Sequence, residues 1–348
     1  MIMEAIQRVV NGESLDQNEA EAVMSEIMTG KATAAQIGAL LVGLRVKRET
    51  AAEISGFARA MRRRAEQVPT RHQLVADTCG TGGDGARTFN ISTMAAFVVA
   101  GAGVPVAKHG NTSVSSRCGS ADVLRHLGVN LDLTPQEMGA CLDAVGIAFL
   151  FAPRLHPAMR HAAVPRREIG IRTVFNVLGP LTNPVNPGAQ VLGVFDRTTA
   201  ELVAYALAEL EVEWAFVVHG AGGLDEVSLA GPSLVWEVRA GTVRPGILDP
   251  AELGFARAGV ETLAGGSPAE NAALALSILQ GAHGPHQDAV VLNAALALLA
   301  SGRAGTMREA VGLAAETLAT GAALEKLEAL IDFTQRCGHA EPNHRLQT

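Results

Sequence analysis

Short apolar segments that alternate with helical patterns are the feature that most constrains the fold of this chain. From about residue 73, apolar runs of four to six residues recur, and helix-start signals lie between them. Parallel strands need helix-length crossovers, so this alternation predicts a doubly wound, mostly parallel sheet. The expected strands are residues 73–76, 104–107, 147–151, 190–195 and 214–219.

The chain outside this region is predicted to be helical. Residues 1 to about 68 show only helical spacing, and Thr50 with Glu53 forms a capping box. Further capping boxes begin at Thr134, Ser267 and Thr306, and the chain after Ser267 is predicted to be nearly all helix. We therefore expect an α/β protein with a small all-helical domain and a large sheet domain. The predicted domains are residues 1–68, joined by helices from about 160–190, and residues 73–348.

A glycine cluster follows the first expected strand, and polar residues follow the cluster. The glycines let backbone N–H groups approach an anion without interference from a Cβ atom. Ser92 or a neighbour is expected to cap a helix that begins there, and helix N-termini attract anions. The next strand ends at Lys108, which would bring an ammonium group to the same edge of the sheet. The segment Asp77–Asn111 is therefore predicted to bind phosphate.

Two other interpretations of the glycines stay open at this point. Gly80, Gly82 and Gly85 match G-x-G-x-x-G, the dinucleotide fingerprint. That fingerprint expects an acidic residue about 20 positions further on, where this chain has Lys108 instead. The other interpretation is a glycine-rich turn that binds nothing, and the neighbouring Asp84, with the polar residues after it, argues against this.

Composition narrows the class of protein. The chain has 348 residues, 48% hydrophobic and 18% charged, which is enough for a soluble protein with two domains. A formal net charge of -7 argues against a general nucleic-acid binder. We recognise no signal peptide or membrane span, so a cytoplasmic protein without a membrane partner is predicted. The cysteines have no C-x-x-C spacing and are expected to be reduced thiols, with Cys79 a packed residue rather than a nucleophile.

Three other segments are candidates for a site. His156 opens a basic stretch that includes Arg166, and most of this stretch is expected to be a solvated helix face. Residues 176–184 are too rich in Gly, Pro and Asn for a regular element, so a shaped loop is predicted. Asp225 and Glu226 come just after a strand. Adjacent acids on a loop are commonly solvated, but beside a phosphate site they can hold Mg²⁺, which prefers one or two carboxylates plus substrate oxygens.

Six motifs, in this order, resemble the anthranilate phosphoribosyltransferase family across nearly the whole chain. They are GTGGDG at 80–85, FNIST at 89–93, KHGN at 108–111, VSSRCGSADVL at 114–124, RREIGIRTVFNVLGPLTNP at 166–184 and GLDEVS at 223–228. The resemblance implies a fold like that of the pyrimidine nucleoside phosphorylases and a homodimer joined through the helical domain. It also implies an enzyme of tryptophan biosynthesis that transfers the phosphoribosyl group of phosphoribosyl pyrophosphate (PRPP) to the amine of anthranilate.

The resemblance further implies three groups of site residues. Those matching positions that hold PRPP are Gly80, Gly83, Asp84, Thr88, Asn90, Ile91, Ser92, Thr93, Lys108, Ser115, Ser116 and Ser120. Those matching positions that contact anthranilate are Gly80, His109, Asn111, His156, Arg166 and Gly179, although a packing role stays open for each histidine. The metal ligands would be Ser92, Asp225 and Glu226, with a pair of Mg²⁺ ions expected, and the catalytic residues would be Lys108, Asp225 and Glu226.

One stretch departs from the family pattern. After KHGN the family usually continues Arg-Ala-Val-Ser-Ser, whereas this chain has Thr112 and Ser113 in the first two places. The loss of one positive charge bears on substrate affinity more than on the type of reaction. A nucleoside phosphorylase would carry a different glycine signature and a longer C-terminal domain. A non-catalytic, nucleic-acid-binding relative would show basic helices and a degraded metal or anthranilate site.

Overall fold

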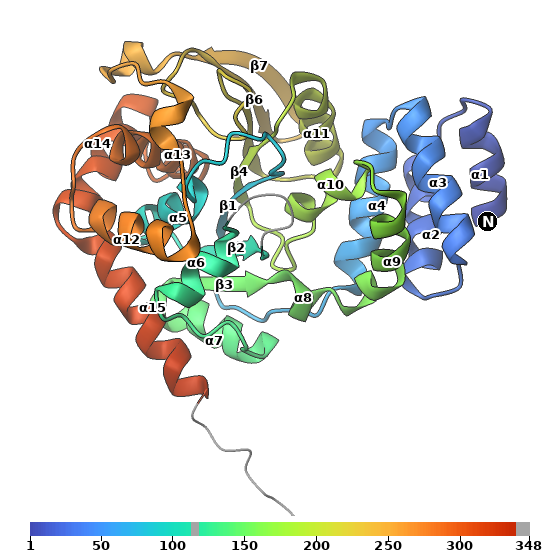
Figure 1. Cartoon of the computed structure of the whole chain (residues 1–348), viewed down its shortest axis with the longest axis horizontal. Helices are drawn as coiled ribbons and strands as arrows, with labels where there is room; N and C mark the ends of the chain where they lie inside the picture. The colour runs from blue at the N-terminus through green and yellow to red at the C-terminus, as the bar shows by residue number, and fades with distance from the viewer. Residues whose placement is uncertain (113–117, 339–348) are drawn as a thin grey trace, which may run out of the picture.

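The computed structural model describes residues 1–112 and 118–338. Figure 1 shows a helical bundle at the N-terminal end beside a larger part built around a sheet. The bundle is made of four consecutive helices from the start of the chain, as predicted. They are α1 (Ile2–Val10), α2 (Gln17–Met28), α3 (Ala34–Lys47) and α4 (Ala51–Arg64).

Local signals explain where the bundle helices begin. Asp16, Thr33 and Thr50 each accept a hydrogen bond from a backbone N–H in the first turn, and each cap is closed by a reciprocal Glu or Gln. A later helix, α9 (Arg160–Ile169), packs against α2 and α3. The bundle therefore contacts a segment that is distant in the sequence.

Seven strands of the described chain form one sheet, in the order β3-β2-β1-β4-β5-β6-β7. Neighbours from β3 through β5 are parallel, whereas β6 pairs antiparallel with β5 and β7 with β6. The strands are β1 (Ala76–Gly80), β2 (Val106–Gly110), β3 (Ile147–Phe151), β4 (Ala189–Gly193), β5 (Trp214–His219), β6 (Ser233–Arg239) and β7 (Thr242–Leu248).

The strand predictions differ in accuracy. Residues 147–151 and 214–219 are confirmed to the residue, and the predictions 104–107 and 190–195 each overlap a strand. The prediction 73–76 shares only Ala76 with β1, which continues through polar residues to Gly80. The hairpin β6–β7 was not predicted, and the loop prediction for 176–184 was partly wrong, because α10 (Phe175–Leu178) and the turn η2 (Gly179–Leu181) lie there.

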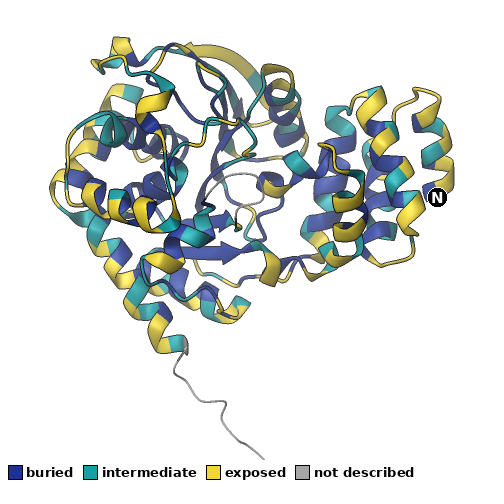
Figure 2. Ribbon diagram, viewed as in Figure 1, coloured by how far each residue is buried: buried dark blue, intermediate teal, exposed yellow. Residues whose placement is uncertain are grey.

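Helices cover both faces of the sheet. Residues that alternate along a strand therefore belong to two separate apolar clusters, one on each face. On β5, Phe216 and Val218 join one apolar cluster, while Ala215 and Val217 join another that continues into the N-terminal bundle. Figure 2 shows these buried strands enclosed by helices. No helix in the described ranges is both long and apolar enough to span a bilayer. The remaining helices are α5 (Ile91–Gly101), α6 (Ser120–His126), α7 (Pro135–Val145), α8 (Ala152–Leu155), η1 (Pro157–Met159), α11 (Arg197–Glu209), η3 (Pro250–Leu253), η4 (Val260–Leu263), α12 (Pro268–Leu279), α13 (Pro285–Ala300), α14 (Met307–Ala319) and α15 (Ala322–Gly338).

Candidate active site

The order of the strands locates the candidate site. The chain proceeds from β1 to β2 in one direction across the sheet and from β4 to β5 in the other. Ligands bind in the crevice at such a switch point, outside the carboxyl ends of the strands. Gly80 at the end of β1 pairs with Gly193 at the end of β4. The glycine-rich segment therefore begins at the place where this fold binds ligands.

Lys108 is buried at this edge and donates across it. Its Nζ donates to the Thr78 carbonyl at 2.6 Å and lies 3.4 Å from Ser92 Oγ. Burial lowers the pKa of Lys108, although the nearby charge of Asp77 acts in the opposite direction. A buried ammonium group facing the start of α5 is well placed to interact with an anionic ligand.

Asp225 and Glu226 lie against the same edge. Asp225 Oδ2 accepts from the Gly82 backbone N–H at 2.7 Å, and Glu226 Oε1 accepts from the Ser92 N–H at 3.1 Å. The fit is close, because a Cβ atom at Gly193 would clash with the Asp225 backbone and one at Gly80 would clash with its carboxylate. The structure thus brings together Lys108, Ser92 and the acidic pair, which are far apart in the sequence.

The electrostatics of the acidic pair fit a cation. Burial, and then the charge of Asp84, raise the pKa of Asp225 to about 7. Burial, and then the charge of Asp225, raise the pKa of Glu226 to about 8. Asp84 Oδ2 is buried and has no hydrogen-bond partner among the described residues. A buried carboxylate is costly to ionise without a partner, and Mg²⁺ prefers carboxylate oxygens as ligands. The acidic pair therefore suits Mg²⁺.

The acidic pair does not form a complete metal cage. In the described ranges, no group of three or more His, Cys, Asp or Glu side chains is arranged to hold a metal ion. Magnesium commonly binds to one or two carboxylates and completes its coordination with water and substrate phosphates. Asp225, Glu226 and the Ser92 hydroxyl could therefore hold Mg²⁺ together with a phosphorylated ligand.

Two of the predicted site residues are histidines that contact each other. His109 Nδ1 lies 3.2 Å from the Gly179 carbonyl, and His156 Nε2 lies 3.2 Å from His109 Nε2. A carbonyl can only accept, so His109 carries its proton on Nδ1 and its Nε2 accepts from His156. Burial lowers the pKa values of His109 to about 3 and of His156 to about 4. Both rings are neutral at physiological pH.

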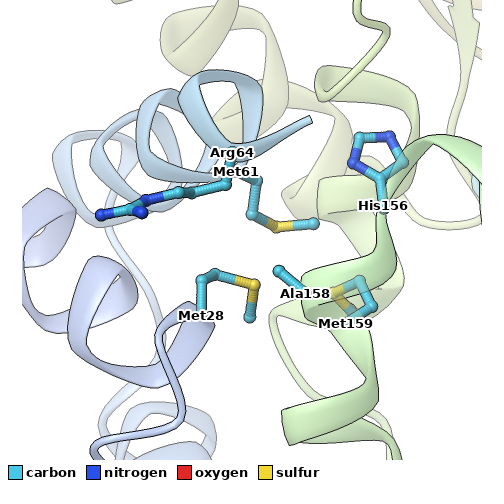
Figure 3. A pocket seen from close by; sticks show the side chains of 6 residues that line it. All are labelled: Met28, Met61, Arg64, His156, Ala158 and Met159. Atoms are coloured by element: carbon cyan, nitrogen blue, oxygen red, sulfur yellow. The ribbon is translucent and has the colours of Figure 1, made fainter. Parts of the chain in front are cut away.

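His156 also borders the junction between the bundle and the sheet domain. Figure 3 shows its ring at the edge of a small pocket formed by α2, α4 and η1. The other residues that line this pocket are Met28, Met61, Arg64, Ala158 and Met159. The lining is largely apolar, with one guanidinium.

Other predicted site residues have different neighbours. The guanidinium of Arg166, on α9, lies over the Phe175 ring, with its Cζ 4.8 Å from the ring centroid, and burial lowers its pKa. Ser120 Oγ donates to the Asn111 carbonyl at 3.3 Å. Ser115 and Ser116, also predicted to hold PRPP, lie outside the described residues.

The structure also bears on the predictions for Asn90 and Cys79, which lie beside the glycine segment. Asn90 is the N-cap residue of α5, as the prediction of Ser92 or a neighbour allowed, but its side chain does not cap the helix. Its Nδ2 instead donates to the Cys118 carbonyl at 3.2 Å. Cys79 is buried and its thiol pKa is raised well above its usual value, chiefly by burial, which agrees with a packing role.

Two buried polar residues that support the site were not predicted. Asp77 Oδ2 accepts from Asn183 Nδ2 at 3.0 Å, and Asn183 Nδ2 also donates to the Ala107 carbonyl at 2.8 Å. Asp77 Oδ1 accepts from the His109 backbone N–H at 3.3 Å. These bonds join β1, β2 and the loop after η2. The local signals were weak, because Asp77 directly follows an apolar run and Asn183 lies in a segment rich in Gly, Pro and Asn.

Two family models match the helical bundle and the α/β domain, and they place the chain in a class of glycosyl transferases. The family model described as "Glycosyl transferase family, helical bundle domain" matches residues 3–65. The model described as "Glycosyl transferase family, a/b domain" matches residues 72–324. Together they cover most of the chain.

Individual relatives narrow this class. An anthranilate phosphoribosyltransferase from Desulforudis audaxviator is 76% identical over 346 residues, which is 99% of this chain and 100% of the relative. The crystal structure of the Thermus thermophilus enzyme has a TM-score of 0.91 at 45% identity and covers 96% of this chain and 100% of that one. The chain belongs to the anthranilate phosphoribosyltransferase family.

The Saccharomyces cerevisiae enzyme is also similar and has been solved with ligands. Its structure in complex with PRPP and Mg has a TM-score of 0.89 at 28% identity, and covers 96% of this chain and 98% of that one. Its structure with 4-fluoroanthranilate has a TM-score of 0.86 at 27% identity, with the same coverage. Neither a nucleoside phosphorylase nor a nucleic-acid-binding relative is supported by these matches.

Proposed function

We propose that this chain transfers the phosphoribosyl group of PRPP to the amine of anthranilate and releases pyrophosphate, as a step of tryptophan biosynthesis. The observation that carries the proposal is the meeting of Lys108, Ser92, Asp225 and Glu226 at the switch point of the sheet. Relatives that match over nearly the whole chain are named for this activity. The family and the site support the same reaction.

In this proposal PRPP binds between the glycine segment and the start of α5. Backbone N–H groups, the hydroxyl of Ser92 and the ammonium of Lys108 then face its phosphates. When bound, a pair of Mg²⁺ ions held by Asp225, Glu226 and Ser92 would neutralise charge that develops on the leaving pyrophosphate. The other residues proposed to hold PRPP are Gly80, Gly83, Asp84, Thr88, Asn90, Ile91, Thr93, Ser115, Ser116 and Ser120.

Anthranilate is proposed to bind on the side where the histidine pair and Gly179 lie. Its aromatic amine is neutral near pH 7, so attack on C1 of the ribose needs no strong general base. His109 and His156 are neutral near pH 7, so neither places a positive charge beside the attacking amine. The chain would thus act through position and electrostatics, without a covalent intermediate.

Anthranilate fluorescence provides the test of this function. We expect the fluorescence to fall only when PRPP and Mg²⁺ are both present, with equimolar release of pyrophosphate. Initial rates at varied concentrations of both substrates should give intersecting lines, because a single displacement needs both substrates bound. Phosphorolysis of thymidine without consumption of anthranilate would favour the phosphorylase alternative, and parallel lines would indicate a ribosyl-enzyme.

Arg166→Ala is expected to raise the KM for anthranilate by about 10- to 100-fold and to leave kcat nearly unchanged. The lost interaction is a charge-assisted bond to the substrate carboxylate, of about 1.5–3 kcal/mol. Steady-state kinetics at saturating PRPP measure this effect. Arg167→Ala is the matched control, because Arg167 is the exposed neighbour on the same helix. An unchanged KM with a reduced kcat would reassign Arg166 to the PRPP step.

We also propose a cytoplasmic homodimer joined through the helical bundle. Of the ten exposed large apolar side chains in the described ranges, seven lie on or beside the bundle helices, with α9 included. Val46 is 80% exposed, Met3 71% and Val10 67%. Exposed apolar groups gathered on one part of a protein are typical of an interface.

Val46→Glu is expected to shift the protein from dimer to monomer. A carboxylate at the centre of an apolar interface would be desolvated without a partner, which costs several kcal/mol. Light scattering coupled to size-exclusion chromatography measures the mass. Ile247→Glu is the control, because Ile247 is 71% exposed on β7, outside the bundle. Equal masses for wild type and Val46→Glu would argue against this interface.

A further inference from the structure

The apolar stretch of helix α13 contains one polar side chain, the amide of Asn293. From Ala289 to Ala300 nearly every residue is buried, and all except Asn293 are Ala, Val or Leu. Asn293 is itself only 2% exposed. A buried amide is costly unless its groups are hydrogen-bonded, so its partners indicate its role.

Asn293 holds one residue of the loop that follows β5. Its Oδ1 accepts from the Val227 backbone N–H at 2.8 Å, and its Nδ2 donates to the Val227 carbonyl at 3.2 Å. The same Nδ2 donates to the Ala289 carbonyl of its own helix at 2.9 Å. The side chain thus satisfies both backbone groups of Val227, as a neighbouring strand would.

Val227 directly follows the acidic pair. The preceding residues have little freedom, because Gly193 and Gly220 allow the backbones of Asp225 and Glu226 to pack closely against the strand ends. Leu224 is joined to Gly220 by a backbone bond of 2.8 Å. Asn293 anchors the segment on its other side, so the carboxylates project from a stretch of chain that is held at both ends.

The same helix also packs against α5, the helix that carries Ser92. Helix α13 packs against α5, which begins one residue before Ser92, and it also packs against β4 and β5. Ser92 and Glu226 meet through the N–H to Oε1 bond of 3.1 Å. A single rigid helix therefore contacts both elements that carry the proposed metal ligands.

We propose that Asn293 is a positioning residue for the acidic pair, which it acts on through the backbone of Val227. By fixing that backbone, Asn293 sets the direction in which Asp225 and Glu226 present their oxygens to a divalent cation and to the pyrophosphate of the substrate. The inference rests on the proposed metal role of the pair. It predicts that Asn293 affects cation binding although it touches neither the cation nor the substrate.

Asn293→Leu keeps the volume of the side chain and removes both bonds to Val227. With PRPP present, the Kd for Mn²⁺, used in place of Mg²⁺ and measured by electron paramagnetic resonance, should rise about tenfold or more. The KM for PRPP should rise with it, whereas the KM for anthranilate should stay near the wild-type value. Asn293→Ser keeps one hydroxyl for Val227 and has less bulk, so it should raise the Kd for Mn²⁺ by a smaller factor. If Asn293→Leu does not fold, the serine variant tests the proposal.

Thr317→Val is the control for a loss of stability alone. Thr317 is buried on α14 and bonds only to its own helix, through Oγ1 to the Leu313 carbonyl at 2.7 Å. It should lower the melting temperature without changing the Kd for Mn²⁺. If the Asn293 variants behave in the same way, the residue only supports the fold and the proposal is wrong. If Asp225→Asn with Glu226→Gln also leaves Mn²⁺ binding unchanged, the metal assignment itself fails.

Discussion

Lys108→Met is expected to lower kcat by about 100- to 1,000-fold, the loss typical of removing one preorganised electrostatic group from an active site. The methionine side chain has nearly the length of the lysine stem but lacks its charge. Lys108 is only 4% exposed, and at such a site an ammonium interacts with phosphate charge far more strongly than it would in water. Turnover at saturating PRPP and anthranilate is the measurement.

The chain offers a matched control for this substitution. Lys326 on α15 donates to the Val145 carbonyl at 2.6 Å, as Lys108 donates to Thr78, but it has no part in the site. Lys326→Met should leave kcat unchanged. Calorimetric titration with PRPP separates binding from chemistry, since a group that acts in the transition state lowers kcat more than it weakens binding. A normal kcat with weakened PRPP binding would make Lys108 a binding residue only.

The predicted fold was most accurate where the local pattern and the burial agree. Residues 147–151 and 214–219 are apolar runs inside the sheet, and their bounds were correct. The first strand was misplaced because Asp77 and Thr78 are polar, yet they are buried and held by distant partners. The strand β7 contains Pro245 and Gly246, which indicate a loop in sequence and are tolerated because β7 lies at the edge of the sheet.

The chemical groups of the candidate site could be predicted from the sequence. The residues that hold those groups in place could not. Lys108, Ser92 and the acidic pair follow strands or begin a helix, so sequence spacing places them at one edge. Asn183 and Asn293 reach their partners across 76 to 106 and 66 residues, respectively. No local pattern encodes contacts of that length. The supports of a site therefore need a structure, whereas its reacting groups can be expected from motifs.

Replacing the acidic pair by amides, Asp225→Asn with Glu226→Gln, should stabilise the free protein at pH 8 while nearly abolishing activity. The amide oxygens can still accept from the Gly82 and Ser92 N–H groups, but the buried like charges are gone. The melting temperature should rise by at least ~1.5 °C, the shift for about 1 kcal/mol in a chain of 348 residues. Calorimetry without ligands measures it, and kcat should fall by about 100-fold or more.

The pH dependence and the ligand response give this double variant a distinctive pattern. Folded pKa values of about 7 and 8 lie above the ordinary values of 3.8 and 4.5, so the stability of the wild type falls as pH rises from the ordinary values to the folded ones. The advantage of the variant should therefore shrink toward pH 5. Adding PRPP and Mg²⁺ should reverse the order at pH 8, because only the wild type binds them tightly. Glu49→Gln, at a carboxyl whose pKa is also raised by burial, should leave activity unchanged. A double variant that gains as much stability from Mg²⁺ with PRPP as the wild type does would exclude the pair as metal ligands.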